Sequence, residues 1–224
     1  MEEHLTNQLK DGGLIPTTPL QNSVKAYQVN NITREEAAPF VEKWHYSHSC
    51  PSGKFFFGLF FNEVLLGVAV FGHPTGRQQA NAYWGSAPNK LIELRRLCCI
   101  DATPKNTESR FISICLRALA HTDYEAVLAM ADINIGHQGI IYQASNFKRI
   151  KVNSHPRYRV FLDGKEIHDR KFAKQRHELN MTNKEVLLHL FGDRVEFKKG
   201  KCKLAYLYIL RKIKGGTNES KRQA

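Results

Sequence analysis

Residues 54–71 read KFFFGLFFNEVLLGVAVF and carry the strongest strand signal in the chain. Aromatic and β-branched side chains fill residues 54–61 and 64–71, with Asn62-Glu63 between the two runs. Such side chains favour strands, and a short polar break between two apolar runs is typical of a hairpin. We therefore predict two long paired strands over this stretch.

Strands and helices alternate on both sides of this hairpin. Further strands are expected over residues 24–30, 91–100 and 126–131. Helices are expected at the capping box Thr33-Arg34-Glu35-Glu36, from Asn106 or Thr107 to residue 121, and over residues 138–145. This order predicts an α/β fold in which helices flank one central mixed sheet. Ligand sites in such sheets lie beyond the carboxyl ends of strands, and Asp132 directly follows the strand 126–131.

The C-terminal third of the chain has a different pattern. Residues 158–162 and 166–168 flank an Asp163-Gly164 turn and predict a second hairpin. Thr182 and Glu185 cap a helix that ends at Phe191-Gly192, and residues 204–210 form a final strand. We expect four regions: a mobile segment over 1–22, a core over 23–150, a basic C-terminal part over 151–213 packed on the core, and a mobile tail over 214–224.

The charge of the chain indicates a polyanionic partner. Its 33 Lys and Arg against 21 Asp and Glu give a formal net charge of +12 over 224 residues. A strongly basic chain favours nucleic acid as a partner, and a merely solvated basic surface is the alternative. The sequence has no apolar run long enough for a membrane helix and no signal peptide, so we expect a cytoplasmic protein that does not bind membranes. The five cysteines show no CxxC spacing and are expected to be reduced.

Three stretches hold more reactive side chains than a packed core needs. Residues 44–54 (WHYSHSCPSGK) place two imidazoles and a phenol between a helix and a strand. Residues 130–147 place a carboxylate at a strand end, followed by Gly-His-Gln-Gly and a tyrosine, which can ligate a metal or act as acid and base. Residues 93–97 and 103–110 surround the start of the long helix, where N–H groups can hold a phosphate. Each stretch also has a structural interpretation: a polar turn, a cap with a packed tyrosine, and simple N-capping.

Taken in order, three segments resemble one known family. They are FVEKWHYSHSCPSGKFFFG, ELRRLCCIDATPKNTESRFISICLRAL and ADINIGHQGIIYQASNF, and the stretches RYRVFLDGKEIHDRKF and FKKGKCKLAYLYIL resemble the tail of the same family. The sequence resembles the Mom family, phage proteins that convert adenine in DNA to a carbamoylmethylated base. The resemblance covers residues 24–213 and implies a fold similar to that of the GNAT acetyltransferases.

The resemblance also implies which residues form the site. The expected catalytic residues are His45, Asp132, Tyr142, Tyr46 and His137, with His48 close behind, and the first three are expected to hold iron. Lys105, Ser109, Arg110 and Arg96 are expected to bind the phosphate of a cofactor. A GNAT enzyme grips acyl-CoA with a glycine-rich turn, and residues 105–110 contain no glycine, which argues against acetyl-CoA.

The chemistry of the family's product gives a second expectation. Adenine N6 is joined to a methylene carbon, which simple acyl transfer cannot achieve, so a redox metal is a plausible means of activating that carbon. N6 is paired in duplex DNA, so the adenine has to be flipped out. The aromatic candidates for stacking on it are Tyr46, Tyr83, Trp84 and Phe147. The expected phosphate contacts are Arg77, Lys148, Arg149, Arg157 and Arg159.

The sequence therefore predicts an enzyme that carbamoylmethylates adenine N6 in double-stranded DNA and so protects phage DNA from restriction. Two alternatives stay open: an acyl-CoA-dependent N-acetyltransferase, and a non-catalytic DNA-binding protein of the same fold. A homodimer is also left open.

Overall fold

The computed structural model describes residues 23–211 except 76, 86, 152–157 and 168. The chain divides into two compact units. Of the described residues, the first unit contains those within 23–130, 139–150 and 205–211, and the second contains those within 131–138 and 151–204. The predicted mobile ends, 1–22 and 214–224, lie outside the described residues.

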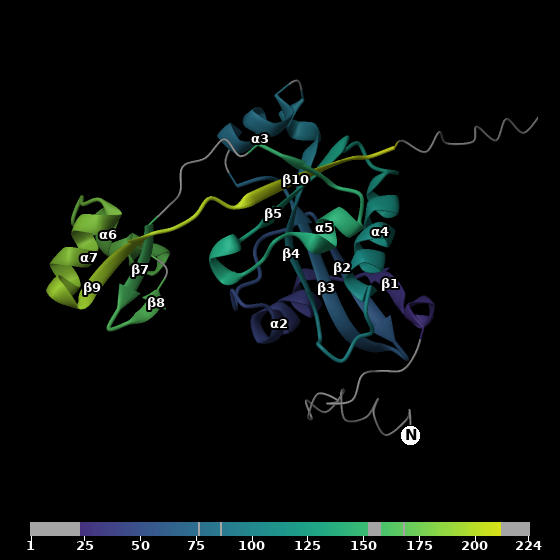
Figure 1. Cartoon of the computed structure of the whole chain (residues 1–224), viewed down its shortest axis with the longest axis horizontal. Coiled ribbons are helices and arrows are strands. Elements are labelled where there is room, and N and C mark those ends of the chain that lie inside the picture. Colours follow the sequence, from purple (N-terminus) through teal and green to yellow (C-terminus); the bar gives the residue numbers. More distant parts are fainter. Residues whose placement is uncertain (1–22, 76, 86, 152–157, 168, 212–224) are drawn as a thin grey trace, which may run out of the picture. The chain divides into compact units, whose positions relative to one another are not determined.

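The first unit is built on a seven-stranded sheet with the order β1-β2-β3-β4-β5-β10-β6 (Figure 1). Strands β1 to β4 pair antiparallel, β4 and β5 pair parallel, and β10 pairs antiparallel with β6. The predicted mixed α/β sheet is therefore confirmed. The strands are β1 (Gln28–Asn31), β2 (Phe55–Phe61), β3 (Val64–Gly72), β4 (Leu91–Cys99), β5 (Ala126–Ala131), β6 (Lys148–Ile150) and β10 (Leu204–Ile209).

The predicted hairpin forms the second and third strands of this sheet. Phe57 and Leu59 of β2 and Val68 of β3 are buried, which is the burial expected for apolar strands covered on both faces. Asn62 and Glu63 both have positive φ, 45° and 64°, as a type I′ hairpin turn requires. Asn adopts this region readily, so the polar break in the sequence indicated the turn correctly.

Helices flank the sheet of the first unit. The Thr33 capping box is present and opens α2 (Arg34–Trp44), and Asn106 precedes α4 (Thr107–Leu119) without a side-chain cap. Phe111, Cys115 and Leu119 of α4 are buried, as the helical stripe predicts. The short α5 (Ile140–Ala144) follows β5, and α3 (Arg77–Trp84) and the turns η1 (Val24–Ala26), η2 (Pro88–Lys90) and η3 (Ile133–Ile135) complete the elements before β6.

Strands β4 and β5 pair over only part of their length. Their parallel register runs from Leu91↔Ala126 to Leu94↔Ala129. Beyond Leu94, β4 continues its pairing with β3, and the β3–β4 register shifts between Val70 and Phe71, so that Arg95 is the extra residue of a bulge. Bulges re-aim side chains, and this one lies where the parallel pairing stops.

The second unit is a three-stranded antiparallel sheet with two helices. Strands β8 (Lys165–Ile167), β7 (Tyr158–Leu162) and β9 (Val195–Lys199) pair in that order. The other elements are η4 (Asp169–Phe172), α6 (Ala173–Glu178), α7 (Asn183–Phe191) and η5 (Gly192–Arg194). Val160, Val186, Leu187 and Val195 form its core. The predicted hairpin and the capped helix α7 are confirmed.

The C-terminal part differs from the prediction in one respect. The sequence places the strand 204–210 in this part, but β10 lies in the main sheet, where Tyr206 pairs with Arg149. Ala205 and Tyr206 are fully buried because β10 is an interior strand between β5 and β6. Residues 151–203 are thus an insertion between two paired strands.

Within the described part of the chain, no helix is both long and apolar enough to span a membrane.

Candidate active site

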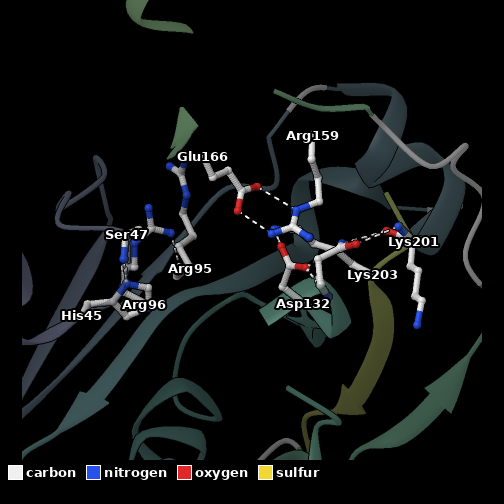
Figure 2. Close-up of polar contacts among 10 residues, drawn as sticks. His45, Ser47, Arg95, Arg96, Asp132, Arg159, Glu166, Lys201 and Lys203 are labelled. Carbon is white, nitrogen blue, oxygen red and sulfur yellow. Dashed lines mark hydrogen bonds and ion pairs between the residues drawn. The ribbon is translucent and has the colours of Figure 1, made fainter. Parts of the chain in front are cut away.

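His45 has a fixed position at the end of helix α2. His45 is the C-cap residue, its backbone N–H donates to Val41 O at 2.9 Å, and its side chain is buried at 7% exposure. The backbone N–H of Ser47 donates to His45 Nδ1 at 3.1 Å, and Ser47 Oγ lies 2.8 Å from the same atom (Figure 2). Nδ1 is therefore the ring atom that faces the Ser47 backbone N–H.

The side chains of Tyr46 and His48, which follow His45, have different environments. The Tyr46 ring contacts the His45 ring, with centroids 4.2 Å apart and the planes tilted by 33°, and remains 51% exposed. His48 turns back with φ 45°, and its Nδ1 lies 2.8 Å from Glu42 O at the end of the helix. Tyr46 thus presents an aromatic surface to solvent, whereas His48 is engaged with α2.

Two arginines of β4 hold the loop that follows. Arg95 Nη1 donates to Ser52 O at 2.8 Å, and Arg96 Nε donates to Ser49 O at 3.0 Å. Successive strand residues normally point to opposite faces, and the bulge at Arg95 lets both reach the same loop. Burial lowers the pKa of Arg96 most, although the charge of Tyr46 opposes this. Arg96, expected to bind a cofactor, thus makes protein contacts here.

Tyr142 of α5 lies in an aromatic group. Its ring is 5.5 Å from that of Tyr206 and 5.8 Å from that of Phe147. Burial raises the pKa of Tyr142 well above its usual range, and the charges of Tyr46, Glu93 and Tyr206 raise it further. Its phenol therefore stays protonated at neutral pH.

Gly139 allows this packing before α5. It has φ 73°, and a Cβ built on it would lie 2.3 Å from the Tyr206 ring. Glycine is needed at this position because the Tyr206 ring approaches its backbone so closely.

The charges of Tyr46 and Glu93 act on both Tyr142 and Arg96. Tyr46 also contacts His45. Glu93 and Arg96 share strand β4, and Arg96 binds the loop that follows Tyr46. We call His45, Tyr46, Glu93, Arg96 and Tyr142 the polar cluster. Glu93 is the member that sequence reasoning missed as a site residue, although a carboxylate within an apolar strand was a usable signal.

Asp132 and His137 belong to the second unit. Asp132 Oδ1 accepts hydrogen bonds from Asn134 N and Nδ2 at 3.0 and 2.9 Å, and Oδ2 pairs with Lys203 Nζ at 3.3 Å (Figure 2). Burial alone would raise the pKa of Asp132, but the Asn134 hydrogen bonds and the Lys203 charge outweigh it and lower the pKa. His137 is exposed, and its backbone N–H donates to Asp132 O at 3.1 Å. That Asp132 shares a pocket with His45 and Tyr142 stays a prediction.

The iron expected at His45, Asp132 and Tyr142 stays a prediction. Among the described residues, no group of three or more His, Cys, Asp or Glu could hold a metal ion. Asp132 is engaged by Asn134 and Lys203 within the second unit.

The expected cofactor residues lie around the start of α4. Ser109 Oγ donates to Asn106 O at 3.1 Å, and Arg110 Nη1 donates to Tyr27 O at 3.2 Å. Lys105 is exposed just before the helix. These contacts are those of a helix start, and phosphate binding by these residues stays a prediction.

The residues predicted to contact DNA phosphates or to stack on the base differ in their exposure to solvent. Lys148 and Arg149 are exposed on β6, and Arg159 pairs with Glu166 (Figure 2). The Arg77 side chain and Arg157 lie outside the described residues. Among the candidate rings, Phe147 is buried, Tyr83 is half-buried, and half-buried Trp84 donates Nε1–H to Glu125 at 3.2 Å. Tyr46 is the exposed ring of the four.

A separate cavity of about 420 Å³ lies at the start of β4. None of the predicted site residues lines it. Its lining residues are Lys54, Phe55, His73, Asn89, Lys90, His121, Thr122, Asp123 and Tyr124.

The mixed sheet defines an α/β protein. The polar cluster lies around β4, where the parallel pairing with β5 stops, and is the candidate active site. The chain belongs to the Mom protein family, whose family model matches residues 26–223. The "Methylcarbamoylase mom" of Escherichia phage Mu is 31% identical over 149 residues, which is 65% of this chain and 61% of that protein. The chain therefore aligns with about three fifths of that relative's length.

The chain is also similar in fold to solved acetyltransferase structures. The N-acetyltransferase from Staphylococcus aureus Mu50 has a TM-score of 0.45 and 14% identity, with 82% of this chain and 97% of that chain covered. The ribosomal-protein-S18-alanine N-acetyltransferase from Escherichia coli has a TM-score of 0.48 and 7% identity, with 85% and 97% covered.

Proposed function

We propose that this chain modifies DNA by attaching a carbamoylmethyl group to N6 of adenine, and that this protects phage DNA from restriction in the host cytoplasm. Its family and the name of its phage Mu relative support the reaction class. The observation that carries the proposal is the polar cluster, in which the exposed Tyr46 ring contacts the buried His45 ring.

The exposed ring suits a flipped adenine. N6 of adenine is paired in the duplex, so the base has to leave the stack before N6 can react. Stacking on an aromatic side chain compensates for part of that cost, about 1–3 kcal/mol per base. Tyr46 offers the face for this stacking, because its ring is 51% exposed.

The remaining residues of the polar cluster can handle the proton that N6 releases in the reaction. When N6 attacks the methylene carbon of a carbamoylmethyl donor, the bond between that carbon and the donor's leaving group breaks, the leaving group departs with the bonding electrons, and one N6 proton has to leave. We assign its acceptance to the carboxylate of Glu93, which lies on β4 three residues before Arg96. Tyr142 stays protonated and can donate a hydrogen bond, and Arg96 fixes the loop beside Tyr46. Lys148 and Arg149 are the proposed phosphate contacts on β6.

Nucleoside analysis tests this proposal. DNA from bacteria that express the chain is digested to nucleosides and weighed by mass spectrometry. We expect deoxyadenosine in which one hydrogen is replaced by a carbamoylmethyl group, and its loss in His45→Ala. The control His121→Ala removes an exposed imidazole from outside the cluster and should keep the product. Unmodified adenine in cells that contain the folded wild-type protein would refute the proposal.

A further inference from the structure

The second unit is strongly basic, and its lysines are concentrated at one end. Residues 151–204 contain 14 Lys and Arg against 7 Asp and Glu. Four of these lysines fall within the six residues Lys198-Lys199-Gly200-Lys201-Cys202-Lys203, which we call the lysine segment. The segment begins in β9 and ends just before β10.

The backbone of the lysine segment is fixed by one side chain. Asn134 Nδ2 donates to Lys201 O at 3.0 Å, and Lys201 N donates to Asn134 Oδ1 at 2.8 Å. A single amide thus satisfies both backbone groups of Lys201, as a neighbouring strand would. Asn134 is itself held by Asp132 Oδ1 through its own N and Nδ2. The segment therefore has a defined position although it lies beyond the end of β9.

The four lysine side chains fall into two classes. Lys198 pairs with Glu196 at 3.1 Å, and Lys203 pairs with Asp132 at 3.3 Å. Lys199 and Lys201 are exposed, and neither forms an ion pair with any acid that the structure describes. Figure 2 shows the Lys201 side chain leaving the network around Asp132. Two charges on a fixed backbone are thus presented to solvent.

We propose that Lys199 and Lys201 bind phosphates of the DNA backbone and that Asn134 is the residue that positions them. Two residues apart, their Cα atoms are separated by at most about 7 Å, so both can act on neighbouring phosphates of one strand. Lysine is a compact point charge that binds phosphate without reading bases, so the contact is independent of sequence. This inference rests on the proposed function only in naming DNA as the partner.

Salt dependence of DNA binding tests the two lysines. The dissociation constant for two duplexes of unrelated sequence is measured by fluorescence anisotropy at several salt concentrations. Each lost phosphate contact lowers the slope of log affinity against log salt by about 0.9, so K199A/K201A should lower it by about 1.8 on both duplexes. The control K25A/K165A removes two exposed lysines from outside the segment and should leave the slope unchanged.

A double-mutant comparison tests the positioning role of Asn134. We expect Asn134→Ala to weaken DNA binding when Lys199 and Lys201 are present, and to change it little in the K199A/K201A background. If Asn134→Ala caused a general loss of structure, it would weaken DNA binding equally in the wild-type and K199A/K201A backgrounds. Thermal unfolding of the Asn134→Ala variant measures such a loss directly.

The outcomes separate this inference from the proposed function. An unchanged salt slope in K199A/K201A, an equal loss in the control, or no binding of wild-type protein to DNA would overturn the lysine site. Adenine that remains unmodified in cells while the slope falls as expected would refute the proposed function and leave the lysine site standing.

Discussion

The polar cluster of the first unit and the lysine segment of the second unit hold their side chains by different means. In the cluster, burial and neighbouring charges set the protonation of Tyr142, and backbone hydrogen bonds fix His45. In the segment, Asn134 fixes the backbone while the charges of Lys199 and Lys201 face solvent. Dissolved salt therefore screens the exposed charges of the lysine segment strongly. The geometry of the polar cluster depends instead on close packing of its side chains. The polar cluster is therefore suited to a chemical reaction, and the lysine segment is suited to binding a polyanion.

The largest expected effect is on packing beside the cluster. Gly139→Ala places a methyl group against the Tyr206 ring and strains a residue with positive φ. We expect a loss of roughly 2–4 kcal/mol in the free energy of unfolding, the sum of overpacking and left-handed strain. Chemical denaturation measures this loss. Gly136→Ala is the matched control, because Gly136 also has positive φ but a Cβ added there would meet no atom within 4 Å. Equal losses in both variants would show that packing against Tyr206 is unimportant.

The next effect is on the reaction itself. Tyr46→Ala removes the exposed ring, and the lost stacking should lower adenine modification about 10- to 100-fold. Tyr46→Phe keeps the ring and should retain most of the product. The fraction of modified deoxyadenosine at matched expression measures both variants. Tyr158→Ala removes a tyrosine of the second unit that is more exposed, 67% against 51%, and serves as the control. A loss in Tyr46→Phe as large as in Tyr46→Ala would argue for a role of the hydroxyl instead of stacking.

A smaller effect concerns the loop beside the cluster. Arg96→Lys keeps the charge but cannot reproduce the donors that reach Ser49 O and Arg95 O. We expect a loss of about 1 kcal/mol in stability and faster hydrogen exchange over residues 45–52. Arg117→Lys, at an exposed position of α4, should change neither. Unaltered exchange in Arg96→Lys would mean that Arg96 does not hold this loop.

The smallest effect is on stability in acid. The folded chain lowers the pKa of Asp132 below its usual value, because Asn134 and Lys203 outweigh the opposing effect of burial. A carboxyl with a lowered pKa stabilises the fold above its unfolded pKa and loses this contribution as the pH falls through the folded pKa. Thermal unfolding between pH 7 and pH 3 should therefore show a loss in the wild type that Asp132→Asn lacks. The difference should stay under about 1 kcal/mol, since Lys203 is half exposed. Identical acid profiles would contradict the assignment.

Much of the fold followed from local signals in the sequence. The strand 126–131 and the capping boxes at Thr33 and Thr182 were predicted at their observed positions, because apolar runs and caps act within a few residues. Helix α3 was missed because its sequence RQQANAYW has little apolar periodicity. Strand β9 was missed because its position depends on pairing with β7 over 30 residues away in the chain.

The site was less predictable than the fold. His45, Tyr46 and Tyr142 were predicted from the resemblance to one family, and the structure places Tyr46 beside His45. The role of Asn134 could not be predicted, because its partner Lys201 lies 67 positions away. Contacts between distant residues leave no local pattern, and Asn134 alone resembles an ordinary turn residue.

The division between chemistry and DNA binding is tested most directly by titrating expression of two variants in bacteria and weighing the nucleosides of their DNA. If the second unit supplies affinity, K199A/K201A should give little modified adenine at low expression and approach the wild-type level when expression is raised. Tyr46→Ala should stay deficient at every level while keeping the wild-type salt slope for DNA binding. Recovery of Tyr46→Ala at high expression, together with a permanent deficit in K199A/K201A, would contradict this account.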